Sequence, residues 1–167
     1  MFIAHLPAGY ISSRYYCQFL AANRAPGNAR NIIIAVGMLG SIMPDLDLFY
    51  FYMIDNRQHS HHSYITHTPI LWLFTFSLIF VVGKLKNLIL LQQLNIIFHI
   101  NITIHLLLDT FAGGIKWLYP LSNHYSQWFH IPSEYQWWVW NFILHWSFFA
   151  ELAIVALAAY LFIRSNK

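Results

Sequence analysis

Charged residues are scarce in this chain: only 9% of its 167 residues are Asp, Glu, Lys or Arg, against about 25% in soluble domains. A single cysteine excludes an intramolecular disulfide framework and a cysteine-rich zinc site. The nine basic residues form no continuous cluster, so we expect no nucleic-acid partner. Hydrophobic residues make up 58% of the sequence and aromatic residues 19%, which is typical of an integral membrane protein.

Long apolar runs predict helices that cross a bilayer, for which about 20 residues suffice. The four strongest runs cover residues 32–54, 65–83, 88–112 and 137–163. A weaker run over residues 1–20 contains Pro7, Gly9 and Arg14. We therefore predict an all-α fold, a polytopic membrane helix bundle with four or five transmembrane helices. It would form a single integral-membrane domain over residues 1–167.

Positive charges predict the orientation of these helices, because cytoplasmic loops carry an excess of Lys and Arg. Arg57 and Lys116 would lie on one side of the membrane, and Arg14 is set aside because it falls in the weaker run. The six remaining basic residues would lie on the opposite side: Arg24, Arg30, Lys84, Lys86, Arg164 and Lys167. We place these six in the cytoplasm, so the loops at residues 55–64 and 113–136 face outward.

Aspartates and histidines gather in three short groups at the ends of apolar segments or inside them. The groups are Pro44-Asp45-Leu46-Asp47, His59-Ser60-His61-His62 with His67 behind it, and His105-Leu106-Leu107-Leu108-Asp109. Carboxylates and imidazoles are costly in apolar surroundings unless they pair, form hydrogen bonds or hold a cation. In the predicted topology all three groups lie near the outer side, and His5 joins them if the first segment is a helix that starts there. The candidate metal ligands are His5, Asp45, Asp47, His62, His67, His105 and Asp109.

Each group alone also has an ordinary structural interpretation. His105 and Asp109 lie four residues apart on one helix face and could pair to orient helix packing. The segment at residues 44–47 could be a solvated turn, and that at 59–62 a surface histidine tract. Their meeting on one side favours a metal site over these interpretations. Four other histidines are not assigned as ligands: His99, His124, His130 and His145.

Histidine and aspartate ligands without thiolate suit Zn²⁺, Mn²⁺ or Fe²⁺. Seven candidates exceed the four ligands of a mononuclear zinc site, so we predict one or two divalent ions, Zn²⁺ or Mn²⁺ before others. Such a centre activates water for hydrolysis. We expect a metal-dependent hydrolase with Asp45, Asp47 and His67 as catalytic residues. Its partner would be membrane lipid, and its substrate a lipid-like molecule or a phosphoester at the outer leaflet.

Two other functions remain open from the sequence. A divalent-metal transporter would spread its ligands through the membrane and would use His99, His145 and Glu151 as well. A catalytically inactive membrane interaction protein would keep only a residual site.

The order of these motifs resembles the membrane-bound, metal-dependent hydrolase family that includes the YdjM-type, LexA-binding inner-membrane proteins. The matching segments are His5-Leu6-Pro7-Ala8-Gly9-Tyr10, residues 40–47, residues 62–68, residues 105–109, Gly114 and Tyr119-Pro120-Leu121-Ser122. The resemblance implies a hydrolase of the bacterial inner membrane. With the orientation predicted from the positive charges, its site would face the periplasm. The family's middle motif reads approximately His-Arg-Gly-x-Thr-His-Ser, and here Ser63 and Tyr64 replace Arg-Gly and Thr68 replaces Ser. The missing arginine could have held a phosphate or a carboxylate, so the substrate class stays open.

Overall fold

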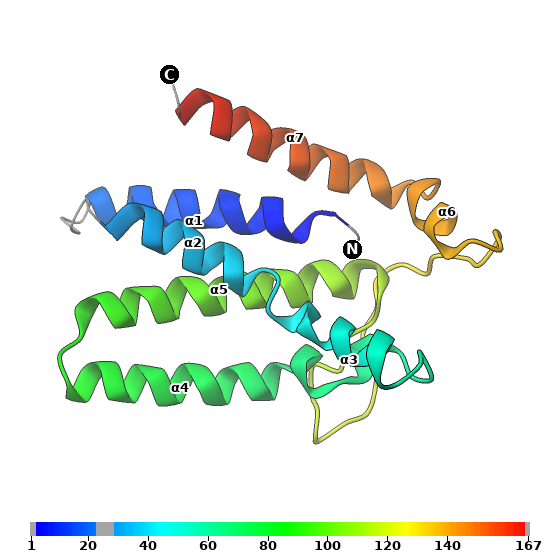
Figure 1. Cartoon of the computed structure of the whole chain (residues 1–167), viewed down its shortest axis with the longest axis horizontal. Helices are drawn as coiled ribbons and strands as arrows, with labels where there is room; N and C mark the ends of the chain where they lie inside the picture. Colours follow the sequence, from blue (N-terminus) through cyan, green and yellow to red (C-terminus); the bar gives the residue numbers. More distant parts are fainter. Residues whose placement is uncertain (1–2, 23–28, 166–167) are drawn as a thin grey trace.

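A computed structural model describes residues 3–22 and 29–165, with the long helices running roughly along one axis (Figure 1). Arg24 and Lys167, which entered the charge count, lie outside the described residues. Apart from an isolated bridge between Ile115 and Ser126, the described residues contain no β-structure, so the predicted all-α class is confirmed. The elements are α1 (His5–Ala22), α2 (Arg30–Gly40), the short 3₁₀ helix η2 (Pro44–Leu46), α3 (Asp47–Met53), the 3₁₀ helices η3 (His61–Ser63) and η4 (Ile65–His67), α4 (Pro69–Leu85), α5 (Ile89–Ala112), α6 (Trp138–Ile143) and α7 (Ser147–Ser165).

The central helix of the bundle is α5, which packs against α1, α2 and α4, whereas α7 packs against α1. The turn between α4 and α5 lies at one end of the bundle, together with the C-terminal end of α7 (Figure 1). At the other end lie α3, α6 and the N-terminal end of α1 (Figure 1). The loops predicted to face outward therefore gather at one end, opposite Lys84 and Lys86.

Judged by helix length and hydropathy, fewer helices qualify as membrane spans than the sequence predicted. Among the described helices, α5 with 24 residues and α7 with 19 are long and apolar enough to cross a membrane, and α2 with the segment Pro44–Met53 adds a third if the bent pair is one span. The apolar α4 has only 17 residues. The 18-residue α1 is interrupted by polar residues, Ser12, Ser13 and Arg14 among them. Four or five spans are thus not confirmed, and the structure supports two or three.

The predicted continuous helix over residues 32–54 is wrong in its middle, because α2 ends at Gly40 and the chain turns by 54° before Pro44–Met53. Proline has no N–H to donate and its ring crowds the carbonyl four residues earlier, so Pro44 ends the regular hydrogen-bond ladder. Asp45 N–H donates to the carbonyl of Ile42 at 3.1 Å. The carbonyl of Ser41 is thereby left for a partner outside this segment.

The predicted helix over residues 137–163 is likewise divided, into α6 and α7. His145 lies between them, with its Nδ1 2.8 Å from Ser147 Oγ and accepting from the Ser147 N–H at 3.4 Å. The first N–H groups of a helix have no partner within the helix, and a side-chain acceptor satisfies one of them here. Because no proline or glycine marks this break, the pattern of apolar residues did not reveal it.

Small and polar residues bring α1 and α2 close to α5. Ser13 and Asn101 are completely buried, and Asn101 Nδ2 donates to Ser13 Oγ at 3.2 Å. A Cβ atom on Gly37 would lie 2.0 Å from Ser13 Oγ, so a larger residue at this position would push the helices apart. Small residues at such contacts let helix backbones approach closely in membranes. The close approach holds α1 and α2 against α5.

We expect Gly40→Ala to destabilise the bundle by about 1–3 kcal/mol, the usual cost of overpacking. The new Cβ would lie 2.3 Å from the carbonyl oxygen of Phe98, a backbone atom of α5 that cannot rotate away. Gly83→Ala is the matched control, because its Cβ would meet Cγ of the flexible Gln92 side chain at 2.9 Å. Thermal unfolding of the two variants in detergent measures the difference, and equal stabilities would contradict the expectation.

Candidate metal centre

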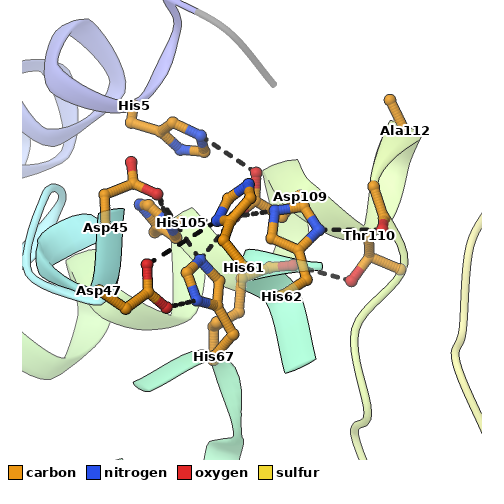
Figure 2. Close-up of polar contacts among 12 residues, drawn as sticks. His5, Asp45, Asp47, His61, His62, His67, His105, Asp109, Thr110 and Ala112 are labelled. Carbon is orange, nitrogen blue, oxygen red and sulfur yellow. Dashed lines mark hydrogen bonds and ion pairs between the residues drawn. The ribbon is translucent and has the colours of Figure 1, made fainter. Parts of the chain in front are cut away.

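All seven predicted ligand residues meet at the end of the bundle where α3 and α6 lie, and Figure 2 shows them gathered around one point. Six of them are buried and Asp45 is half-buried. They come from six elements: His5 begins α1, Asp45 lies in η2, Asp47 begins α3, His62 lies in η3, His67 ends η4, and His105 and Asp109 lie one turn apart on α5.

Four of these residues form a group in which one ligand atom from each lies within 4.8 Å of all the others: Asp45, His67, His105 and Asp109. We call them the central cluster. Asp45 Oδ1 lies 3.6 Å from Nε2 of both His67 and His105. Asp109 Oδ2 lies 2.9 Å from His105 Nε2 and 3.6 Å from His67 Nε2. The carboxylates therefore face the same two imidazole nitrogens.

The three separations of 3.6 Å fit shared ligation of a cation better than direct hydrogen bonding. A nitrogen–oxygen distance of 3.6 Å is too long for a hydrogen bond. Two ligands bound at about 2.1 Å to one tetrahedral ion lie about 3.4 Å apart. His67 Nε2 is fully buried and has no hydrogen-bond partner among the described residues, a state that is costly unless a cation binds there. The residues present thus fit a divalent ion.

The second ring nitrogen of three histidines fixes the direction in which Nε2 points. The three contacts join His67 Nδ1 to Asp47 Oδ2 at 2.6 Å, His105 Nδ1 to the Ser41 carbonyl at 2.7 Å and His62 Nδ1 to the Gly113 carbonyl at 2.9 Å. Carbonyl and carboxylate oxygens only accept, so each Nδ1 donates and each Nε2 is left for a metal. Metal-binding histidines are commonly oriented in this way. The helix break before Pro44 therefore supplies the acceptor that orients His105.

The electrostatics of His62 and His67 also favour a bound cation. Burial lowers the pKa of His62 to about 4, so its ring is neutral at pH 7. Its Nε2 lone pair then faces Asp109 Oδ2 at 3.7 Å, acceptor to acceptor. Burial also acts to lower the pKa of His67, but the carboxylates of Asp45 and Asp47 outweigh it and raise that pKa to about 9. The negative field that holds a proton on His67 would equally attract a metal ion in its place.

Asp47 lies beside the central cluster and contacts it through His67. Its Oδ2 accepts from His67 Nδ1 and, also at 2.6 Å, from Thr66 Oγ1. Its Oδ1 is buried without a hydrogen-bond partner among the described residues and lies 3.8 Å from Nδ1 of His61. Asp45, Asp47, His61 and His67 form a second group with metal-ligand spacing. This group shares Asp45 and His67 with the central cluster.

His61 is the site residue that the sequence interpretation missed, because it was read as part of a surface histidine tract. It lies 4.0 Å from His62 and 5.1 Å from His67 between ring centroids. The signal was its place directly before His62, in the loop between two apolar segments that carries the other predicted ligands His62 and His67. One turn of 3₁₀ helix over His61–Ser63 places both imidazoles at the site.

His5, the residue contributed by α1, reaches the other oxygen of Asp109. Its Nε2 lies 3.1 Å from Asp109 Oδ1. Its ring stacks on that of His105, with 3.9 Å between the centroids and 23° between the planes. The N-terminal helix therefore closes one side of the cluster, so His5 joins the other predicted ligands.

Histidines that were not assigned as ligands lie elsewhere. His59 is exposed and pairs with Asp55 at 2.8 Å. The Nδ1 atom of His99 lies 2.9 Å from the carbonyl oxygen of Asn95, and its Nε2 atom lies 3.0 Å from Thr75 Oγ1. The interactions of His99 are those of a packing residue between α4 and α5. Neither histidine belongs to a group with metal-ligand spacing among the described residues.

A cavity of about 490 Å³ opens beside the cluster. Asp45, His61, His62 and Asp109 are part of its lining, so the cluster is accessible from the cavity. Apolar walls come from Leu48 and three aromatic residues, Phe51, Tyr52 and Phe142. Its volume falls within the range of about 300–1,000 Å³ that is common for small-molecule sites.

The fold and the site define a helical membrane protein with a buried cluster of histidines and aspartates that could hold a divalent ion. The sequence matches the YdjM inner membrane protein family over residues 3–166, and the chain belongs to this family. The resemblance that the motifs suggested is thereby confirmed as to family. No curated protein and no solved structure matches the chain significantly.

We expect His67→Ala and Asp109→Asn each to lower the affinity for Zn²⁺ or Mn²⁺ by at least about 100-fold, because each removes a ligand that other side chains already orient. His59→Ala is the matched control, since His59 is exposed and bonded to Asp55. Elemental analysis of the purified proteins and calorimetric titration measure the change. Full metal content in the Asp109 variant would leave only a helix-packing role for the His105–Asp109 pair.

Proposed function

We propose that the protein is a membrane-embedded, metal-dependent hydrolase that cleaves a phosphoester or an ester of a lipid or lipid-linked substrate at the outer leaflet. The observation that carries the proposal is that the central cluster borders the cavity through Asp45 and Asp109. Structural zinc sites are closed, whereas catalytic sites keep a position open for water or substrate. A bound divalent ion would lower the pKa of a water molecule and stabilise charge on a phosphoryl or acyl oxygen.

The positions of the three expected catalytic residues assign a different role to each. Asp45 is half-buried and lies at the boundary between cluster and cavity, so it can ligate an ion and also accept a proton from an attacking water. His67 is fully buried and would hold the ion through Nε2. Asp47 orients that ring through Nδ1, so its catalytic contribution would be made through His67.

Ion transport is less well supported than hydrolysis. A transport path needs ligands along the depth of the membrane. His99 is bonded to Thr75 and Asn95, and Glu151 accepts from the N–H of Ile3 at 2.5 Å. The described residues with metal-ligand spacing all lie at one end of the bundle.

The proposed orientation places the site on the periplasmic side of the inner membrane. Reporter fusions at Asn56 and Ser122 should therefore read as external, and a fusion at Asn87 as cytoplasmic, because Lys84 and Lys86 flank the turn at Asn87. Paired alkaline phosphatase and fluorescent-protein fusions measure this directly. A cytoplasmic reading at Asn56 would place the site on the inner side and would contradict the outer-leaflet substrate.

Hydrolysis should require both the metal and Asp45. We expect Asp45→Asn to lower turnover by about 100-fold or more, the usual contribution of a positioned acid or base, while the protein stays folded and inserted. The assay is a panel of lipid phosphates, lipid esters and soluble phosphoesters, with chelation and metal re-addition, and His59→Ala as the control variant. Turnover that survives chelation, or none on any substrate with metal bound, would contradict the proposal and favour metal binding or transport.

A further inference from the structure

One fixed positive charge, that of Arg57, belongs to the lining of the cavity beside the cluster. Its guanidinium carbon lies 5.1 Å from the centroid of the Tyr52 ring, which is also part of the lining. This is the distance of a cation–π contact, and it keeps the guanidinium at the mouth of the cavity. The side chain is exposed, so its donors remain accessible to a ligand entering from outside.

The backbone at this position is held in an uncommon conformation. Asn56 and Arg57 have φ values of 49° and 62°, in the left-handed region that is unfavourable for a non-glycine residue. Arg57 N–H donates to the carbonyl of Phe51 at 3.1 Å, which ties the loop back to α3. Such strain is commonly found where a side chain must be aimed at a ligand. Here the bend brings Arg57 over the ring of Tyr52.

Arg57 also has no carboxylate to neutralise it among the described residues, which include no ion pair of its guanidinium. The neighbouring acidic residue, Asp55, is engaged by His59 through both its side chain, at 2.8 Å, and its N–H, at 3.0 Å. The guanidinium is therefore available to an anion that approaches the cluster. Guanidinium groups bind phosphate and carboxylate through two parallel hydrogen bonds.

We infer that Arg57 selects a substrate with an anionic group, and that this substrate is an amphiphile whose phosphate binds between Arg57 and the central cluster. Phe51, Tyr52 and Phe142 supply apolar walls for the part of the molecule next to that phosphate. The inference rests on the proposed function, since it names the substrate class of the same site. Both the charge at the mouth and the apolar lining are needed for it: the first alone would suit free phosphate, the second alone a neutral lipid.

Binding can be tested without turnover. The probes are dioctanoyl phosphatidic acid, its neutral counterpart dioctanoylglycerol and inorganic phosphate, titrated calorimetrically into Zn²⁺-supplemented protein in a neutral detergent. We expect the wild type to prefer the phosphatidic acid over both other probes. Arg57→Gln should weaken its binding by about tenfold or more, since hydrogen bonds to a charged group are stronger than those between neutral groups. Arg57→Lys should retain part of the preference, because it keeps the charge and loses the paired donors.

Lys116→Gln is the control, because Lys116 is the other basic residue expected on the outer side and its ammonium lies over Tyr125 instead, 4.8 Å from the ring centroid. An equal effect of Lys116→Gln would show a general surface charge effect and overturn the inference. Anion preference that is unchanged in Arg57→Gln, equal affinity for the neutral lipid, or equally tight binding of free phosphate would each overturn it too. Arg57-dependent binding without any turnover would overturn the hydrolase proposal alone. Turnover of neutral esters that is unaffected in Arg57→Gln would overturn this inference and leave the hydrolase.

Discussion

Burial of the Asp109 carboxylate is the constraint on which the site end of the bundle, where α3 and α6 lie, depends. Within 3.7 Å of its two oxygens lie Nε2 atoms of four histidines, which come from α1, η3, η4 and α5. A carboxylate that is 2% exposed in an apolar bundle requires charge or hydrogen bonds around it. Four separate segments of the chain satisfy that requirement at one point. Fold and site are therefore parts of the same arrangement, and removal of the aspartate would affect both.

The interruption between α2 and η2 is as important as the helices it separates. A continuous helix would commit the carbonyl of Ser41 to Asp45 and would direct the residues after it along a single axis. The bend instead leaves that carbonyl to His105 Nδ1 and brings Asp45 beside Nε2 of the same ring. A local defect in the hydrogen-bond ladder thus supplies both an orienting acceptor and a ligand. Irregular backbone at membrane depth is tolerated where it is buried in protein in this way.

The candidate site was more predictable from the sequence than the details of the fold. Carboxylates and imidazoles are so costly in apolar segments that Asp45, His67, His105 and Asp109 could be recognised by residue type, and charge asymmetry placed them at one end. The features that the sequence did not predict depend on contacts between residues far apart in the sequence. The role of Asp47 in orienting His67 could not be read from spacing alone, and neither could the approach of His61. The break at His145 carries no proline or glycine. Hydropathy alone did not separate the 17-residue apolar α4 from the longer helices α5 and α7, so the count of four or five spans was not confirmed.

The interior of the bundle explains how so polar a site is held without a large hydrophobic core. Its centre is occupied by Ser13, Asn101 and His105, each completely buried, and the helices approach through small residues such as Gly37 and Gly40. In a membrane the hydrophobic effect contributes little to helix association, so van der Waals contacts and interhelical hydrogen bonds hold the helices together. The contact of Asn101 with Ser13 lies one helical turn below His105 on α5. The polar stripe on α5 that joins α1 and α2 therefore continues directly into the stripe that could hold the metal.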